Sequence, residues 1–127
     1  MSRIKTLIAG FLLSFGVCAY AAEPDELTEI IATCAGRMSA ELEFAWLLSD
    51  PQAEIFEEQR LRFVEILETL APVTNPEHRL GLRIDAKMAH ASLLTNAYFG
   101  TNAARAAWAK RHAITQRNHC QNMLLDS

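Results

Sequence analysis

Prolines that directly follow helix-capping residues constrain this chain more than any other feature. Asp50-Pro51 and Asn75-Pro76 each join an N-cap residue to a proline that suits the first position of a helix. Ala71-Pro72 stops a helix, while Gly100 and Thr101 predict a left-handed C-cap followed by a new N-cap. These signals predict four helical segments, at residues 25–48, 51–70, 76–99 and 102–124.

Apolar residues recur at three- and four-residue steps within these segments, which is the pattern of a helix that packs on one side. In the first three segments the pattern predicts core positions at Leu27, Ile30, Ile31, Cys34, Met38, Ala45, Leu48, Phe56, Phe63, Ile66, Leu67, Leu70, Leu80, Ile84, Met88, Ala91 and Tyr98. The fourth segment is rich in alanine, which favours a helix and permits close approach to its neighbours. Four helices joined by short turns predict an all-α fold, an antiparallel up-down four-helix bundle.

The first 21 residues have the pattern of an export signal. Arg3 and Lys5 give a cationic start, and residues 7–18 form a short apolar core. Ala19-Tyr20-Ala21 then supplies the small residues that a signal peptidase reads. The pattern predicts that the mature protein begins directly after this segment.

Two other readings of the leader, a lipid anchor and a retained membrane anchor, fit less well. Val17 precedes Cys18 where a lipoprotein needs a small residue, and the apolar run is too short to span a bilayer. We therefore expect a cleaved signal peptide at residues 1–21 and a single helical domain at residues 22–127. We also expect a periplasmic or secreted protein without a stable membrane anchor.

Cleavage removes one of the three cysteines and leaves Cys34 and Cys120. In an oxidising compartment a single pair in a small domain predicts a structural disulfide, with free thiols or a soft-metal site as alternatives. In an up-down bundle the first and last helices are antiparallel neighbours, so an early residue of one meets a late residue of the other. We therefore expect an interhelical disulfide between these two cysteines.

Glu41 lies in the middle of the apolar stripe of the first helix. A bare carboxylate there would be costly to desolvate, so it needs a partner. Arg37 lies one turn earlier, and Arg117 lies within about a turn of the height of Glu41 if the disulfide sets the register. We predict a buried ion pair of Glu41 with Arg37 and Arg117; a metal-ligand or general-base role and an exposed position are the alternatives.

Trp108, His112 and His119 lie along one flank of the fourth helix. The two histidines are about 10 Å apart on a helix, too far to bind one metal ion without another helix. A solvated histidine flank is the simplest reading. The functional reading is a partner-binding strip anchored by Trp108, because tryptophan is enriched at binding hot spots.

Motifs that carry a specific chemistry are absent from the sequence. It has no His-Glu-x-x-His, no glycine-rich phosphate loop, no Gly-x-Ser-x-Gly and no Cys-x-x-Cys. We therefore expect that the protein is not an enzyme, and we predict no catalytic residue, no metal ligand and no cofactor.

An exported four-helix bundle of this size resembles the periplasmic b-type haem cytochromes in outline. The resemblance implies a haem held between a methionine near the start of the first helix and a histidine near the end of the fourth. His119 could take the second place, but Leu27, Thr28 and Ile30 occupy the opening turns of the first helix. The alternative function is therefore a metal or haem carrier that uses the bundle interior or the His112/His119 flank.

Charge is distributed unevenly along the chain. Residues 23–68 carry twelve acidic side chains against three arginines, whereas residues 76–126 carry seven basic side chains against three acidic ones. Either the two halves pair along their rims, or one face docks a charged partner. The net charge of −3, which becomes −5 without the leader, disfavours nucleic acid. We predict an exported, non-catalytic protein that acts through its surface as an interaction, accessory or inhibitor-type binder.

Overall fold

The computed structural model describes residues 24–70 and 75–126. Its regular elements are four helices: α1 (Pro24–Leu47), α2 (Ala53–Thr69), α3 (Pro76–Phe99) and α4 (Ala103–Leu125). The all-α prediction is confirmed. No helix in the described ranges combines the length and apolar character needed to cross a membrane. The predicted signal peptide and the predicted Ala71-Pro72 stop lie outside the described residues.

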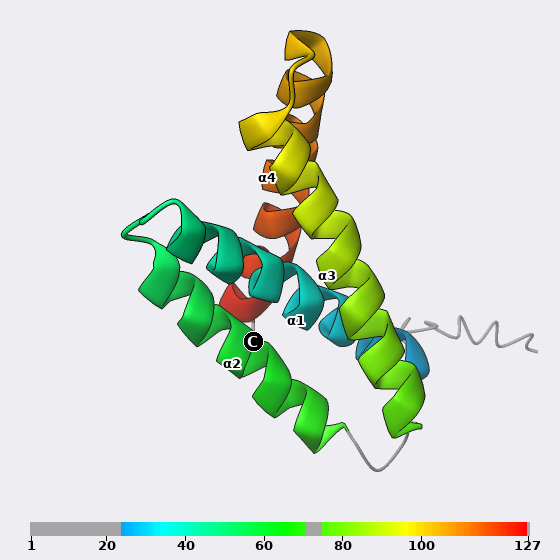
Figure 1. Ribbon diagram of the computed structural model, residues 1–127. Coiled ribbons are helices and arrows are strands. Elements are labelled where there is room, and N and C mark those ends of the chain that lie inside the picture. The colour runs from blue at the N-terminus through cyan, green and yellow to red at the C-terminus, as the bar shows by residue number, and fades with distance from the viewer. Residues whose placement is uncertain (1–23, 71–74, 127) are drawn as a thin grey trace, which may run out of the picture.

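The helix α1 is the centre of the arrangement (Figure 1). α2 packs along one side of α1 and α3 along another, whereas α4 packs mainly on α3. α4 approaches α1 near the disulfide, and Gln121 of α4 donates a hydrogen bond of 3.0 Å to Gln59 of α2. An up-down bundle is not confirmed, because its first and last helices would be neighbours along their length.

The main core lies between α1 and α2. It is formed by buried residues from both helices, chiefly Ile31, Cys34, Ala35, Met38, Phe63 and Leu67. Burial of each large apolar side chain stabilises the fold by about 1.5–3 kcal/mol. A second cluster of Ala40, Leu94 and Ala113 connects α1, α3 and α4. The apolar stripes predicted for the first two helices thus face each other.

Most of the α3 stripe that was predicted to enter the core is exposed, and only Ala91 of it packs against the second cluster. Leu80, Ile84, Met88 and Tyr98 are 54%, 50%, 63% and 52% exposed to solvent. The opposite face, which includes the fully buried His90, packs on α1 and α4 instead. The prediction was wrong because α3 carries two faces that both suit a neighbour, and the inward one brings His90 to Glu41 and Gln116.

A close approach of α1 to α3 fixes which face of α3 turns inward. At Gly36 a Cβ atom would overlap the backbone oxygen of Arg83 and lie 3.0 Å from the Cβ of Ala86. Only glycine lets the two helices come this near without a shift. The residues of α3 around Arg83 therefore face α1.

Two of the predicted helix starts differ in outcome. Asn75 caps α3 as predicted, because its side-chain oxygen accepts a 2.9 Å hydrogen bond from the N–H of Glu77. Asp50 was predicted to cap the second helix, but it accepts from the N–H of Gln52 within a turn. α2 begins only at Ala53 and has no side-chain cap.

The connection from α3 to α4 also differs from the prediction. Gly100 has φ −68° and ψ 138°, so the chain leaves α3 in an extended rather than a left-handed conformation. Glycine is still needed, because a Cβ there would overlap the backbone oxygen of Asn96. The cap of α4 is Asn102 rather than Thr101; its side-chain oxygen accepts from the N–H of Arg105 at 2.9 Å.

At the C-terminus of α1 one residue has a left-handed backbone conformation that was not predicted from the sequence. Ser49 has φ 53°, and its N–H donates to the oxygen of Trp46 at 3.2 Å. The N–H of Asp50 donates to the oxygen of Ala45 at 2.8 Å. These two bonds form a Schellman motif with serine at the position that usually holds glycine.

Candidate functional site

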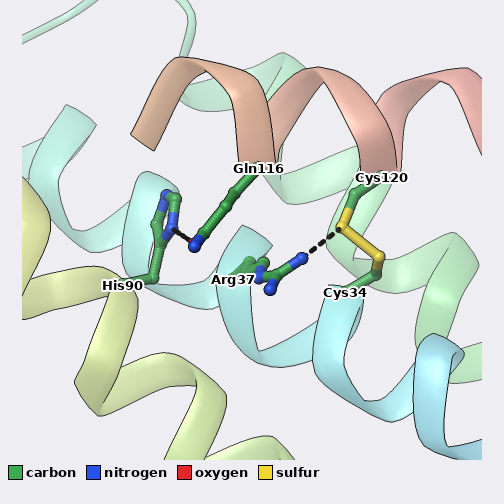
Figure 2. Close-up of a disulfide and its surroundings, with 5 residues drawn as sticks. All are labelled: Cys34, Arg37, His90, Gln116 and Cys120. Atoms are coloured by element: carbon green, nitrogen blue, oxygen red, sulfur yellow. Dashed lines mark hydrogen bonds between the residues drawn. A yellow bond between two sulfur atoms is a disulfide. The ribbon is translucent and has the colours of Figure 1, made fainter. Parts of the chain in front are cut away.

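Cys34 and Cys120 form the predicted disulfide, with 5.5 Å between their Cα atoms (Figure 2). Both cysteines are buried, and they tie the last part of α4 to the first half of α1. The Nη1 of Arg37 lies 4.0 Å from the Sγ of Cys120. Burial lowers the pKa of the Arg37 guanidinium, because desolvation disfavours its charged form.

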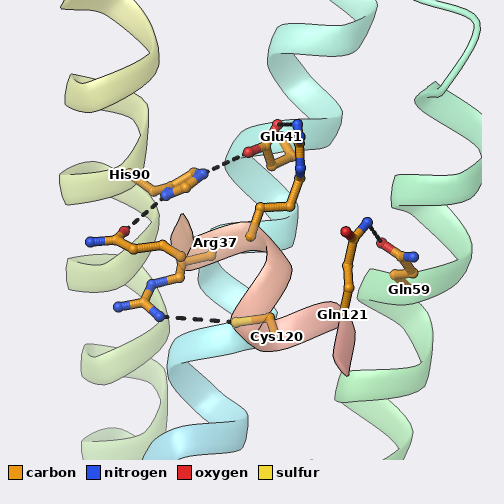
Figure 3. A network of polar contacts seen from close by, with 8 residues as sticks. Arg37, Glu41, Gln59, His90, Cys120 and Gln121 are labelled. Atoms are coloured by element: carbon orange, nitrogen blue, oxygen red, sulfur yellow. Dashed lines mark hydrogen bonds and ion pairs between the residues drawn. The ribbon is translucent and has the colours of Figure 1, made fainter. Parts of the chain in front are cut away.

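Near the disulfide, Glu41, His90 and Gln116 form a chain of polar side chains (Figures 2 and 3). The Nε2 of His90 lies 2.8 Å from Oε1 of Glu41, and its Nδ1 lies 3.1 Å from Oε1 of Gln116. His90 is fully buried and Glu41 is 5% exposed. Because these residues come from α1, α3 and α4, their contacts join three helices inside the fold.

The structure places two basic side chains beside Glu41, and Arg37 is not one of them. The Nη1 of Arg117 lies 3.6 Å from Oε2 of Glu41, and its guanidinium also lies 5.8 Å from the ring centre of Phe56. Arg37 points to the disulfide instead (Figure 3). The second neighbour is His90, which the sequence reasoning missed because it assigned the other face of α3 to the core.

A cleft of about 220 Å³ opens beside this polar centre, where α1, α3 and α4 meet. Its lining includes Glu41 and Arg117 from the interior, and Asp50, Tyr98 and Lys110 from the surface. The cleft therefore brings acidic and basic groups together next to an aromatic ring.

The predicted strip on α4 is exposed, but its three residues do not form one group. Trp108 is 51% exposed and stacks on His112, with ring centres 4.8 Å apart and an interplanar angle of 18°. His119 lies about two turns further along, next to the buried Cys120. Among the described residues, no group of three or more histidine, cysteine, aspartate or glutamate side chains could hold a metal ion.

Beyond α1 and α2, α3 and α4 continue as a projecting helical hairpin (Figure 1). We call residues 95–112 the α3–α4 arm. Only Ala109 of the arm is buried. Its three large aromatic residues, Tyr98, Phe99 and Trp108, are 52%, 57% and 51% exposed. Tyr98 and Phe99 both contact the ring of Phe44 and so form one exposed apolar patch, and a contiguous patch of this kind marks a site of interaction.

The chain was compared with protein-family models, with curated proteins and with solved structures. None of the three comparisons found a match. The function of the protein must therefore follow from its own interior and surface. The interior contains a disulfide and the polar contacts of Glu41, His90 and Gln116, and the surface carries the α3–α4 arm.

Proposed function

We propose that this protein is a small exported, non-catalytic helical protein that binds another protein through the α3–α4 arm. The observation that carries the proposal is the exposure of Tyr98, Phe99 and Trp108 on one projecting hairpin. Each aromatic side chain buries about 150–250 Å² when it is fully covered, so a partner would gain much apolar contact here.

The foundation of the arm supports this role. The ring of Phe44 in α1 lies 6.4 Å from the ring of Tyr98 and 6.5 Å from that of Phe99, measured between centres. Ala113, just after the arm, is buried against Ala40 and Leu94. Tyr98 and Phe99 are thus presented on a packed base, which lowers the entropy that binding must remove.

The buried polar groups support a structural rather than a catalytic role. Both ring nitrogens of His90 are engaged by Glu41 and Gln116, and none of its surface is exposed. A general acid or base must reach the proton that it transfers in the substrate. The contacts of His90 instead hold three helices together.

Export is supported by the leader pattern of residues 1–21 and by the Cys34–Cys120 disulfide, since such bonds persist in oxidising compartments. Mass spectrometry of the protein from its native cells should give an N-terminus at Ala22. Alkylation without a reductant should modify neither cysteine. A protein that retains residues 1–21 and has two free thiols would contradict export.

Site-specific photo-crosslinking in native cells tests the binding function. A photoreactive amino acid at Tyr98 or Phe99 should give one adduct of defined mass, and Trp108→Ala should abolish it. The same group at Ile55 of α2, which is 51% exposed, is the matched control and should not give that adduct. Loss of every arm adduct, or equal adducts at Ile55, would contradict the proposal. An absorption spectrum and elemental analysis of the same preparation test the carrier alternative.

A further inference from the structure

We infer that the partner of the α3–α4 arm is an acidic protein segment, which Arg105 and Arg111 contact on either side of Trp108. The inference rests on the proposed function and names the chemistry of the partner. The arginines bind carboxylates, and Trp108 supplies the apolar anchor.

The basic residues around the arm have no acidic counterpart nearby in the sequence. Residues 86–125 contain no aspartate and no glutamate. Two cations of this stretch have acidic partners on α1: Lys87 pairs with Glu43 at the surface, and Arg117 lies beside the buried Glu41. The acidic residues of α1 thus compensate the basic groups that pack against α1.

The cations of the arm itself lie at its surface. Arg105, Lys110 and Arg111 are exposed, and none of them makes an ion pair with any residue in the described ranges 24–70 and 75–126. A cluster of one sign on a projecting element attracts a partner of the opposite sign and speeds their encounter.

Two of these cations, Arg105 and Arg111, share one face of α4 with Trp108 and His112. Arg105, Trp108, Arg111 and His112 follow each other at three- and four-residue steps or are adjacent, so they lie on neighbouring positions of the helix surface. The buried Ala109 lies at the edge of this face, four residues after Arg105 and three before His112. The stacking of Trp108 on His112 restricts the indole ring before a partner arrives, which reduces the entropy lost on binding.

A protein segment fits this face better than a nucleic acid or an anionic membrane. The face has only a few cations, while residues 23–68 carry twelve acidic side chains against three arginines. An extended polyanion would meet that acidic half as well and be repelled. A short acidic segment meets only the arm, and tryptophan with arginine is the composition of a protein-binding hot spot.

The two tryptophans of the chain allow a direct test. Trp46→Phe leaves Trp108 as the only indole, and Trp108→Phe leaves Trp46, which is 58% exposed on α1. The probe is a short synthetic peptide of glutamates around one central leucine; the control peptide has lysines in their place. The glutamate peptide should change the fluorescence of Trp46→Phe saturably, leave Trp108→Phe unchanged, and bind more weakly as salt is raised.

Charge reversal distinguishes a local contact from the effect of net charge. In the Trp46→Phe background, Arg105→Glu and Arg111→Glu should each weaken peptide binding by about tenfold. Arg62→Glu on α2 makes the same change in net charge at another exposed site and should alter binding less than about twofold. Circular dichroism of each variant checks that the helices are intact.

Several results would overturn the inference. They are the absence of a saturable change in Trp108 fluorescence, equal weakening by Arg62→Glu, or tighter binding of duplex DNA or anionic phosphatidylglycerol vesicles than of the glutamate peptide. The proposed function has a separate readout. If arm crosslinking to a native protein persists while the peptide fails, the arm binds a protein of other chemistry; if both fail, the proposed function falls as well.

Discussion

Glu41 and His90 depend on each other because both side chains are buried and their charged or polar atoms face one another at 2.8 Å. Removal of one member leaves the other without its partner in a medium where water cannot replace it. Removal of both members leaves no orphaned group of the pair. The stability that a single substitution loses therefore reflects the penalty of leaving the other residue buried without a partner more than the net strength of the pair.

We predict that Glu41→Leu lowers the free energy of unfolding by about 3–5 kcal/mol, because His90 and Arg117 both lose the carboxylate. The double variant Glu41→Leu/His90→Leu should cost less than the sum of the two single variants. Urea unfolding of the four proteins completes the double-mutant cycle. Additive costs would show that the two residues do not act as a pair.

Substitution by alanine should change the free energy of unfolding in opposite directions at Gly36 and at Gly81. Gly36→Ala should lower the free energy of unfolding by about 1–3 kcal/mol, because the added methyl group meets the backbone of α3 at Arg83. Gly81→Ala should raise it by about 0.5–1 kcal/mol, because no other part of the structure lies within 4 Å and alanine favours the helix. Denaturant melts of both variants check this; a stabilising Gly36→Ala would disprove the close approach of α1 and α3.

At the scale of single elements, the backbone at the C-terminal end of α1 has a strained residue that a substitution could relieve. Ser49 adopts φ 53°, a conformation that glycine reaches without steric cost. Ser49→Gly should therefore raise the free energy of unfolding by about 0.5–1 kcal/mol. Ser39→Gly, in the interior of the same helix, should lower it by about 1 kcal/mol. Thermal melts that show the same sign for both variants would contradict the Schellman cap.

The helices could be predicted from the sequence more fully than their faces and ends. Asn75-Pro76 starts α3 because capping and proline geometry act within a few residues. The helix start predicted at Asp50-Pro51 was wrong because the N–H of Asp50 takes part in the Schellman motif that ends α1, and α2 begins only afterwards. The inward face of α3 was missed because Leu80, Ile84 and Met88 repeat as a core stripe would. That choice depends on Gly36 and Glu41, which lie on another helix.

The candidate site shows the same division between local and long-range information. The burial of Glu41 and the exposure of Trp108 follow from positions on single helices, and both agree with the sequence pattern. The contact of Glu41 with His90 joins residues 49 positions apart and needs the packing of α1 on α3. The projection of the arm likewise depends on how far α1 and α2 reach along α3, which no local pattern encodes.

In the molecule as a whole, the disulfide decides how firmly α4 is held to α1. It closes a separation of 86 residues, which stabilises the fold by about 4 kcal/mol on the chain-entropy model. Cys34→Ala/Cys120→Ala should therefore lower the Tm, with the fastest gain of hydrogen exchange at residues 114–125. Residues that pack on α3, such as Ala113, should lose less protection. Uniform loss across α4 would contradict this account; reduced wild-type protein is the control.

The distance in sequence between the two cysteines also sets the order of events during biosynthesis. Cys34 is made early and its partner comes 86 residues later. Until Cys120 is added, Cys34 cannot form this bond. Covalent closure therefore requires that α2, α3 and nearly all of α4 have been synthesised.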